Sequence, residues 1–515
     1  MPDIERALNA PPGAIRTFGA SWPLLVALLA LLAVLGNAQL NVLADADTYL
    51  HLGIGRWILE HGAVPQSDPF SHSMPGTAWV AHEWLSALML NAVHQLTGWA
   101  GLTVLAALLY AGTLAYLLRF LLARMEPVHA ILFTAFAASM LLGYLLARPH
   151  VLVWPLLAVW VGSLVNAGEQ GRGPPWRMLP LMALWANLHG SFMLGLGMGA
   201  ALALDAVLMC PVAQRRAAAR RWAVFVGLSA VAAMITPLGW HGLWFPVKLI
   251  GMSGTLAFIG EWRSPNFHQM QILEVWLMLM LAIAGAGRMR LPWLRLLLVL
   301  GLAHLALKHQ RHVSILGLVT PFLLATPMAR HWRATAGTGR DAESLDRIFQ
   351  ALAAPAKAGA VAATALLATL LIGTTVQSRD FAPAVARTPA AAMRAAVQAG
   401  ASGPVLNAYD FGGYLIYSGV PVFIDGRADM YGDALMKRYM DALSLSMTDN
   451  LPRLLADYRI GWTLLQPGTP ALALLDRLPG WRRVYADTIA VAHVRVGDGR
   501  STAILEPFNA PTPAP

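Results

Sequence analysis

Long apolar segments recur along most of this chain, and only short polar turns separate them. A helix needs about 20 apolar residues to cross the hydrocarbon core of a membrane. Only 12% of the residues are charged, whereas soluble domains are usually about 25% charged. We therefore predict a polytopic α-helical membrane protein. Its predicted spans, about eleven in all, cover residues 21–43, 100–124, 129–147, 149–166, 177–188, 191–210, 222–237, 271–287, 291–307, 313–328 and 355–376.

Positive charge along the chain indicates which loops lie in the cytoplasm. The segment 84–97 is too short and polar to cross, so we expect it to lie on the membrane surface or to re-enter. With a cytoplasmic N-terminus, cytoplasmic segments hold eighteen Lys and Arg residues, and the opposite short loops hold six. This asymmetry follows the positive-inside rule and predicts a periplasmic C-terminal domain. Because it also explains the net charge of +10, no nucleic-acid partner is expected.

The polar segment after the first apolar run is the most unusual part of the sequence. Asp45 and Asp47 lie where the chain leaves that run, at the start of a predicted outer loop over residues 44–99. Carboxylates there are candidates for a catalytic general base or for metal ligands. The alternative is structural, because Asp47 is also a suitable N-cap for a helix over 48–61. The mixed composition of that helix suits the headgroup region of a membrane.

Other polar groups interrupt apolar runs on the same predicted side. Each of them is a candidate functional residue, and each also has a purely structural explanation, such as a turn, a surface ion pair or interfacial snorkelling. The Lys308–His312 cluster is the best candidate for a cationic grip on a phosphate. Eleven of the fifteen histidines also fall on this side, which favours a polar outer cavity. The candidate phosphate- or substrate-binding residues are His51, His82, Glu83, Arg148, His150, His189, Glu261, Arg263, Lys308, Arg311 and His312.

After residue 376 the pattern changes to that of a small α/β domain, which we place at 377–508 after a membrane domain at 1–376. Short strands are expected near 405–409, 420–425, 461–465 and 488–496, with loop near 412–417 and helices near 433–446 and 450–458. Asp425 and Asp429 follow a predicted strand, and an ion-paired turn is favoured over a metal site there. The Pro- and Ala-rich tail 509–515 is predicted to be disordered.

The outer loop resembles that of the GT-C superfamily of membrane glycosyltransferases, which includes the lipid A aminoarabinose transferase, protein O-mannosyltransferases and the oligosaccharyltransferase catalytic subunit. Asp47-Thr48-Tyr49 resembles the Asp-Glu-x-Tyr that opens this loop in the lipid A enzyme type. Gly55 to Gly62 and Pro75 to Leu85 resemble its following segments. A closer resemblance is to mostly uncharacterised bacterial membrane proteins that share Asp-x-x-x-His and a later His-Glu-Trp-Leu.

Two positions depart from the superfamily pattern. Thr48 stands where an acidic residue is expected, and His82-Glu83 replaces a lysine near the start of the next helix. The usual cation for a phosphate is therefore missing from that place. Because of this departure, a non-catalytic assembly protein with the GT-C scaffold is an alternative interpretation.

The resemblance implies an inverting glycosyltransferase in a bacterial inner membrane. Its donor would be a sugar on a polyprenyl phosphate, and its acceptor a glycan, lipid or protein. Asp47, with Asp45, would be catalytic, and cations such as Arg148 and Arg311 would stabilise the leaving phosphate. No cofactor is certain, but Mg²⁺ or Mn²⁺ on Asp47, His51 and Glu83 is an open expectation. A transporter of lipid-linked saccharides is the other alternative, although its polar groups would line a pathway through the membrane.

Overall fold

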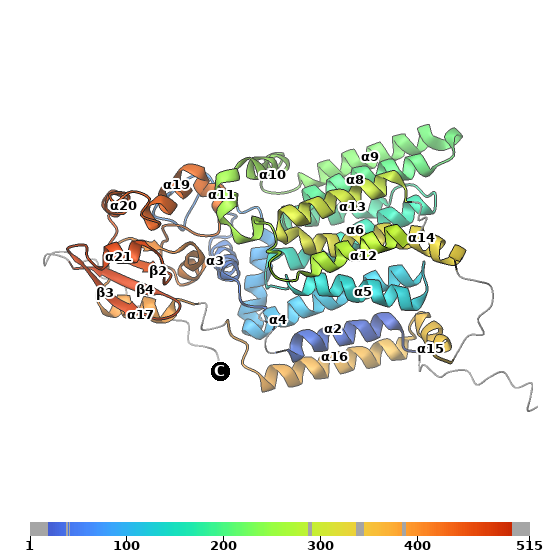
Figure 1. The fold of residues 1–515 in the computed structure, drawn as a ribbon, viewed down its shortest axis with the longest axis horizontal. Coiled ribbons are helices and arrows are strands. Elements are labelled where there is room, and N and C mark those ends of the chain that lie inside the picture. Colours follow the sequence, from blue (N-terminus) through green and yellow to red (C-terminus); the bar gives the residue numbers. More distant parts are fainter. Residues whose placement is uncertain are drawn as a thin grey trace, which may run out of the picture.

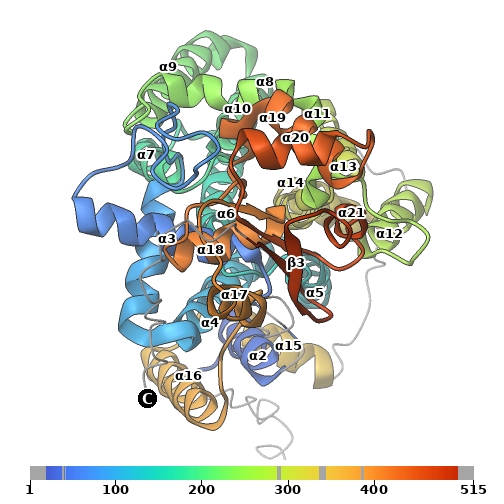
Figure 2. The ribbon, with the colours of Figure 1, turned by 90° about the vertical axis from the view of Figure 1, so that its left-hand side faces the viewer.

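The computed structural model describes residues 19–37, 40, 42–286, 291–335, 344–383 and 388–496, and the predicted disordered tail 509–515 lies outside these residues. Most helices run side by side in one bundle, and a smaller unit containing a sheet lies at one end of it (Figure 1). Seen from that end, the smaller unit lies over the ends of the bundle helices (Figure 2). The bundle and the unit each contain a hydrophobic core.

Each of the eleven predicted apolar runs contains a helix. Within the described residues, five helices are long and apolar enough to cross a membrane, and three shorter apolar helices accompany them. The number of crossings therefore stays a prediction. The bundle helices are α2 (Trp22–Gly36), α4 (Trp84–Leu122), α5 (Pro127–Leu142), α6 (Pro149–Glu169), α7 (Leu179–Leu188), α8 (Phe192–Met209), α9 (Arg215–Ala233), α12 (Ile272–Ala286), α13 (Trp293–Lys308), α14 (Val313–Thr335) and α16 (Ala358–Ser378).

The predicted outer loop begins with helix α3 (Ala46–His61). Its N-cap is Asp45, whose side chain accepts a hydrogen bond from the backbone N–H of Asp47 at 2.8 Å. The alternative reading of Asp47 as the N-cap is therefore wrong, and its carboxylate is available for other contacts. Gly55 allows α3 to pack closely on α4, because a Cβ there would lie 2.6 Å from the Cβ of Asn91.

Helix α4 consists of two helical segments that meet at a kink. Gly98 interrupts it with φ 64° and ψ −159°, a conformation that glycine adopts readily. Residues 84–97 therefore form a segment distinct from the longer apolar segment that follows. This break agrees with the separate helix predicted for 84–97. Glu83 occupies the N-cap position of α4 and makes no capping hydrogen bond.

The C-terminal unit contains a four-stranded sheet with the order β1-β2-β4-β3. Strand β1 pairs parallel with β2, and the other neighbours are antiparallel. The predicted helices near 433–446 and 450–458 and the strands near 405–409, 461–465 and 488–496 are confirmed. The elements are α17 (Ala390–Gln398), β1 (Val405–Asn407), η6 (Tyr409–Phe411), α18 (Gly412–Tyr417), α19 (Ala428–Leu443), α20 (Asn450–Asp457), β2 (Trp462–Leu465), α21 (Ala471–Leu475), β3 (Trp481–Ala486) and β4 (Val491–Arg495).

Two predictions for this unit are wrong. Residues 412–417 form helix α18, and residues 420–425 do not form a strand. Instead, Val422 makes a single parallel bridge to Ser71 of the outer loop. Gly413 packs against the backbone of Ala46 in α3, so α18 and α3 approach more closely than a larger residue would allow. Docking against the outer loop, rather than local propensity, determines these two segments.

A buried ion network joins the outer loop to the C-terminal unit. Arg427 pairs with Asp425 at 2.7 Å and with Asp68 of the outer loop at 2.5 Å. Tyr431 donates a hydrogen bond to Asp425 at 2.5 Å. The predicted ion-paired turn at Asp425 is therefore confirmed. Apolar side chains of the outer loop, including Trp79, also belong to the core of this unit, so the loop and the unit form one packed body.

A second buried network lies among the bundle helices. Arg295 of α13 pairs with Glu169 of α6 at 2.7 Å and with Asp205 of α8 at 2.9 Å. Arg124, at the end of α4, also pairs with Glu169, at 3.0 Å. Buried charges are tolerated when they are paired and hydrogen-bonded. These contacts connect four helices, and none of the four residues lines the cavity described below.

Candidate active site

A cavity of about 1050 Å³ lies between the helical bundle and the C-terminal unit. Its walls come from α3, the start of α4, the start of α6, the turn between α7 and α8, and the short helices η3 (Gly260–Trp262) and η4 (Gln310–His312). The C-terminal unit completes it. Of the thirteen candidate site residues, all line the cavity except Arg263 and Lys308, although residues 308–312 were the favoured cationic cluster.

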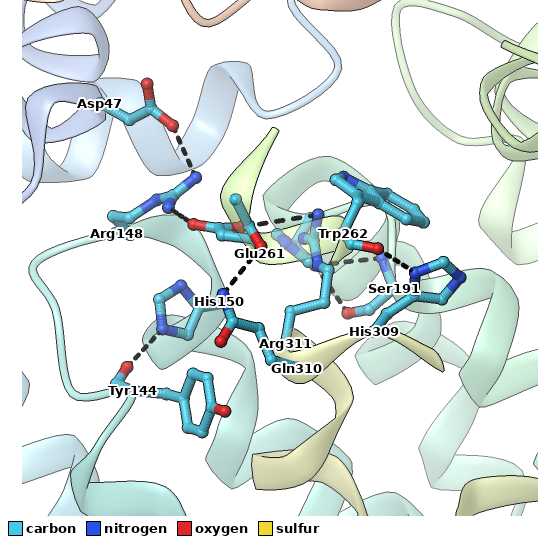
Figure 3. Close-up of polar contacts among 12 residues, drawn as sticks. Asp47, Tyr144, Arg148, His150, Ser191, Glu261, Trp262, His309, Gln310 and Arg311 are labelled. Carbon is cyan, nitrogen blue, oxygen red and sulfur yellow. Dashed lines mark hydrogen bonds and ion pairs between the residues drawn. The ribbon is translucent and has the colours of Figure 1, made fainter. Parts of the chain in front are cut away.

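Arg148 lies at the centre of the charged groups in this cavity. It is the N-cap residue of α6, and its guanidinium contacts three carboxylates from two separate segments. The distances are 3.1 Å to Asp45 Oδ2 and 2.6 Å to Asp47 Oδ2, and Glu261 Oε1 forms the third contact. Figure 3 shows Arg148 between Asp47 and Glu261. Residues more than 100 positions apart in the sequence thus meet at one guanidinium.

Backbone contacts hold Arg148 beside the start of α3. The N–H of Ala147 donates to the carbonyl of Val42 at 2.8 Å. The hydroxyl of Thr48 donates to the carbonyl of Ala147 at 3.2 Å, and Thr48 is buried. Thr48 therefore has a clear structural role in this chain. It fixes the residue before Arg148, at a position where an acidic side chain would have no such donor.

The pKa of Asp47 is suited to proton transfer near neutral pH. It is raised from 3.8 to about 7, mainly by burial; Arg148 lowers it, and the carboxylates of Asp45, Glu261 and Glu83 contribute to the rise. Burial would lower the pKa of Arg148, but its carboxylate neighbours raise it well above the usual value, so Arg148 stays charged. A general base works best when its pKa lies near the operating pH.

Glu261 connects Arg148 to a second arginine. Its Oε2 atom lies 3.8 Å from Nη1 of Arg311, while its Oε1 atom contacts Arg148. Burial would raise the pKa of Glu261, but Arg148 and Arg311 lower it to about 2. The Arg311 guanidinium also lies over the ring of Trp262, 4.9 Å from its centroid. Glu261 is therefore an ionised carboxylate between two cations from different loops (Figure 3).

Elsewhere in the cavity, three imidazoles surround Glu83. The Nε2 atoms of His51, His82 and His189 lie 3.5, 3.8 and 3.4 Å from its carboxylate oxygens. These distances are too long for strong hydrogen bonds. His51 follows Asp47 by four residues, so both side chains lie on one face of α3. Burial lowers the pKa of His51 to about 4, partly offset by Glu83, and therefore His51 is neutral near pH 7.

The His189 turn is fixed against the start of α4. Ser86 donates to the carbonyl of Leu188 at 2.6 Å, and the Trp84 indole donates to Asn187 Oδ1 at 2.8 Å. His150 is fixed by a contact of 2.7 Å between its Nε2 atom and the carbonyl of Tyr144 (Figure 3). The turn that carries His189 and the side chain of His150 are therefore held by backbone or neutral groups.

The described residues do not form the expected metal site. Among them, no group of three or more His, Cys, Asp or Glu side chains is arranged to hold a metal ion. Asp47 Oδ2 is engaged by Arg148 at 2.6 Å, and Glu83 faces imidazoles instead of Asp47. The set Asp47, His51 and Glu83 therefore does not fit a metal in this arrangement, and the divalent metal stays a prediction.

The C-terminal unit contributes residues to the cavity that the sequence did not reveal. Tyr409, Asp410 and Gly426 are among the lining residues. A Cβ at Gly426 would collide with Oδ1 of Asp47, so only glycine leaves that oxygen unobstructed. The pKa of Tyr409 is raised well above its usual value by burial and by Asp47, so its hydroxyl stays protonated. No local pattern signals these residues, because their role depends on how the unit docks.

Comparison with known proteins identifies the fold. No protein-family model matches the sequence, and no curated protein shows significant sequence similarity to it. Among solved structures, the oligosaccharyltransferase AglB from Archaeoglobus fulgidus, in complex with an inhibitory peptide and a dolichol-phosphate, is similar with a TM-score of 0.50 and 10% identity. The match covers 86% of this chain and 69% of AglB. The apo form of that enzyme gives a TM-score of 0.51 at 11% identity, with the same coverage.

This chain shares the fold of the oligosaccharyltransferase AglB. The predicted resemblance is thereby confirmed at the level of the fold. ArnT from Cupriavidus metallidurans, in a structure with bound undecaprenyl phosphate, matches over 92% of this chain and 98% of its own length, with 13% identity and a TM-score of 0.43. At such low identities the similarity concerns architecture, and function must be argued from the site.

Proposed function

We propose that this GT-C protein is an inverting glycosyltransferase that uses a sugar on a polyprenyl phosphate as donor. One observation carries the proposal. Asp47, with a pKa of about 7, and Arg148 form an ion pair of 2.6 Å in a cavity at one end of a membrane helical bundle. A base and a cation side by side suit group transfer from a lipid phosphate to a hydroxyl.

In this reaction Asp47 takes the proton of an acceptor hydroxyl. The acceptor oxygen forms a bond to the anomeric carbon, and the bond from that carbon to the phosphate oxygen breaks with inversion. The lipid phosphate leaves with the bonding electron pair, and Arg148 and Arg311 stabilise its charge. Asp45 holds Arg148 from a second direction. Because a phosphate is a good leaving group, this reaction includes no second acid to protonate it and no step at a metal ion.

Two sets of side chains in the cavity suit the two substrates. Arg148 and Arg311 offer cations to the donor phosphate. Glu83 and the neutral imidazole of His51 offer acceptor atoms for hydrogen bonds from hydroxyl or amine groups. We therefore assign the Glu83 side to the acceptor, a glycan, lipid or protein. The inner membrane of a bacterium, with the cavity and C-terminal unit in the periplasm, is the location that the Lys and Arg distribution favours.

The test uses purified full-length protein and a panel of polyprenyl-phosphate sugars, and it measures released polyprenyl phosphate and glycosylated product. Asp47→Asn should lower transfer at least about 1000-fold, because it removes the base while keeping the size of the side chain. Asp457→Asn, at an exposed ion pair outside the cavity, is the matched control and should keep full activity. Full activity of Asp47→Asn would overturn the assignment.

The same assay separates the two alternatives. A transporter of lipid-linked saccharides would move the donor between leaflets of a vesicle and leave its glycosidic bond intact. A non-catalytic assembly protein would bind the lipid and release no phosphate. The arrangement disfavours a transporter, because the charged groups of the cavity gather at one end of the bundle. The buried charges of Arg295 and its partners, elsewhere in the bundle, are already neutralised by one another.

A further inference from the structure

Glu261 occupies the position between the two cavity arginines that a phosphate would take. One of its oxygens contacts Arg148, and the other lies 3.8 Å from Arg311. Carboxylate and phosphate groups present similar oxygen pairs to guanidinium groups. The Glu261 side chain is 34% exposed, more than that of Arg148 at 15%, so Glu261 is the more accessible member of this pair.

The position of the Glu261 backbone does not depend on its carboxylate. Segment η3 is held against η4 by hydrogen bonds from Gln310, whose backbone N–H donates to the carbonyl of Arg263 at 2.9 Å. The Gln310 side chain donates to the carbonyl of Gly260 at 2.8 Å. His309 Nδ1 contacts the carbonyl of Trp262 at 2.6 Å (Figure 3). The Glu261 side chain can therefore leave the arginines while its segment stays in place.

Charge makes the two occupants mutually exclusive. Arg148 and Arg311 supply two positive charges, while Asp45 and Asp47 remain bonded to Arg148. With Glu261 in place, three negative charges surround these cations. A phosphate added without displacing Glu261 would bring at least a fourth, and like charges packed at this separation repel one another. The incoming phosphate must therefore displace Glu261.

We propose that Glu261 is a built-in competitor for the phosphate subsite formed by Arg148 and Arg311. When no donor is bound, Glu261 pairs with both arginines. The donor phosphate then displaces Glu261, and after transfer Glu261 displaces the lipid phosphate from the arginines. The free lipid phosphate is a monoester and carries more charge than the donor's diester, so it holds the arginines more strongly. Glu261 therefore promotes product release. This inference rests on the proposed function.

The experiment measures binding of farnesyl phosphate, as the sugar-free probe, to full-length protein in detergent by calorimetry. Glu261→Gln should bind the probe about tenfold tighter, equivalent to about 1.4 kcal/mol, because a neutral amide competes less with phosphate. Asp410→Asn removes one negative charge from the same cavity, where Asp410 accepts a hydrogen bond from Gln466 at 3.0 Å. It should tighten binding distinctly less than Glu261→Gln. In the transfer assay, Glu261→Gln should also show stronger inhibition by the product lipid phosphate.

Arg311→Gln separates failure of this inference from failure of the proposed function. If Arg311→Gln weakens probe binding but Glu261→Gln leaves it unchanged or weaker, the competitor role is overturned and the phosphate subsite stands. If Arg311→Gln leaves probe binding unchanged, the subsite fails, and with it the donor assignment. Equal tightening in Glu261→Gln and Asp410→Asn would show a general charge effect and would also overturn the inference. A thermal unfolding curve for each variant confirms that it is folded.

Discussion

Replacing Arg427 with methionine tests whether one buried guanidinium holds the outer loop to the C-terminal unit. Arg427 donates to Asp425 through Nε at 2.8 Å and Nη2 at 2.7 Å, and to Asp68 through Nη1 at 2.5 Å. Its side chain is 3% exposed, and both carboxylates are fully buried. Its guanidinium also lies 4.7 Å from the ring centroid of Trp79.

The substitution leaves two buried carboxylates without a cation. Removing one partner of a buried ion pair costs about 3–5 kcal/mol, because the remaining charge stays desolvated. For a unit of this size, each kcal/mol lowers the unfolding midpoint by roughly 2–4 °C. We therefore expect Arg427→Met to lower the midpoint by on the order of 10 °C. The affected transition should be that of the C-terminal unit together with the outer loop.

Thermal unfolding of full-length protein in detergent, followed by tryptophan fluorescence at one scan rate, measures this shift. The matched control is Arg438→Gln, whose partner Asp457 is 57% exposed, so its loss should cost at most about 1 kcal/mol. Adding Asp68→Asn and Asp425→Asn to Arg427→Met should recover part of the loss, because the unpaired charges disappear. A midpoint equal to that of Arg438→Gln, or no recovery, would refute the reasoning.

Further predictions concern Asp47. The pKa of Asp47 is raised from 3.8 to about 7, so its contribution to folding stability should be lost as the pH rises between these two values. The transfer rate should rise over pH with a midpoint near 7, because Asp47 acts as a base only when it is ionised. Glu261→Gln should move that midpoint down, since Glu261 raises the pKa of Asp47; an unchanged midpoint in the pH–rate profile would contradict this. Gly426→Ala should lower transfer about tenfold or more by crowding Asp47 Oδ1, as misplacing a reacting group is costly. Gly373→Ala, where a Cβ has no atom within 4 Å, should leave the rate unchanged, and equal rates in both variants would argue against the crowding.

The helices of the bundle were predictable because their signal is local. Each apolar run contains enough adjacent apolar side chains to define a helix whatever it packs against. The separate segment at 84–97 was also predictable from its polarity, and Gly98 marks its end. By contrast, α18 begins with Gly412 and Gly413, which locally favour loop. Contact of Gly413 with the backbone of Ala46 explains why these glycines lie in a helix.

The candidate site was predictable in its residue types and only partly in its geometry. Arg148 and Glu261, both predicted site residues, meet Asp47 in one charged cluster. Lys308 does not line the cavity, although its neighbour Arg311 does. Lys308 ends α13, whereas Arg311 belongs to η4, where the chain turns towards η3. Lys308 and Arg311 are three residues apart, but the end of α13 lies between them, and only Arg311 reaches the cavity. The position of a helix end cannot be read from sequence spacing with that precision.

The missing lysine has a physical explanation in this arrangement. A cation at position 83 would lie near the three imidazoles that surround Glu83 in this chain. Here that position carries a carboxylate, while the cations beside Asp47 and Glu261 are Arg148, at the start of α6, and Arg311, in η4. The negative charge of Glu83 repels a phosphate, and the two arginines attract it. We therefore expect a lipid phosphate to bind at Arg148 and Arg311 rather than at position 83, and the carboxylate at that position strengthens this preference.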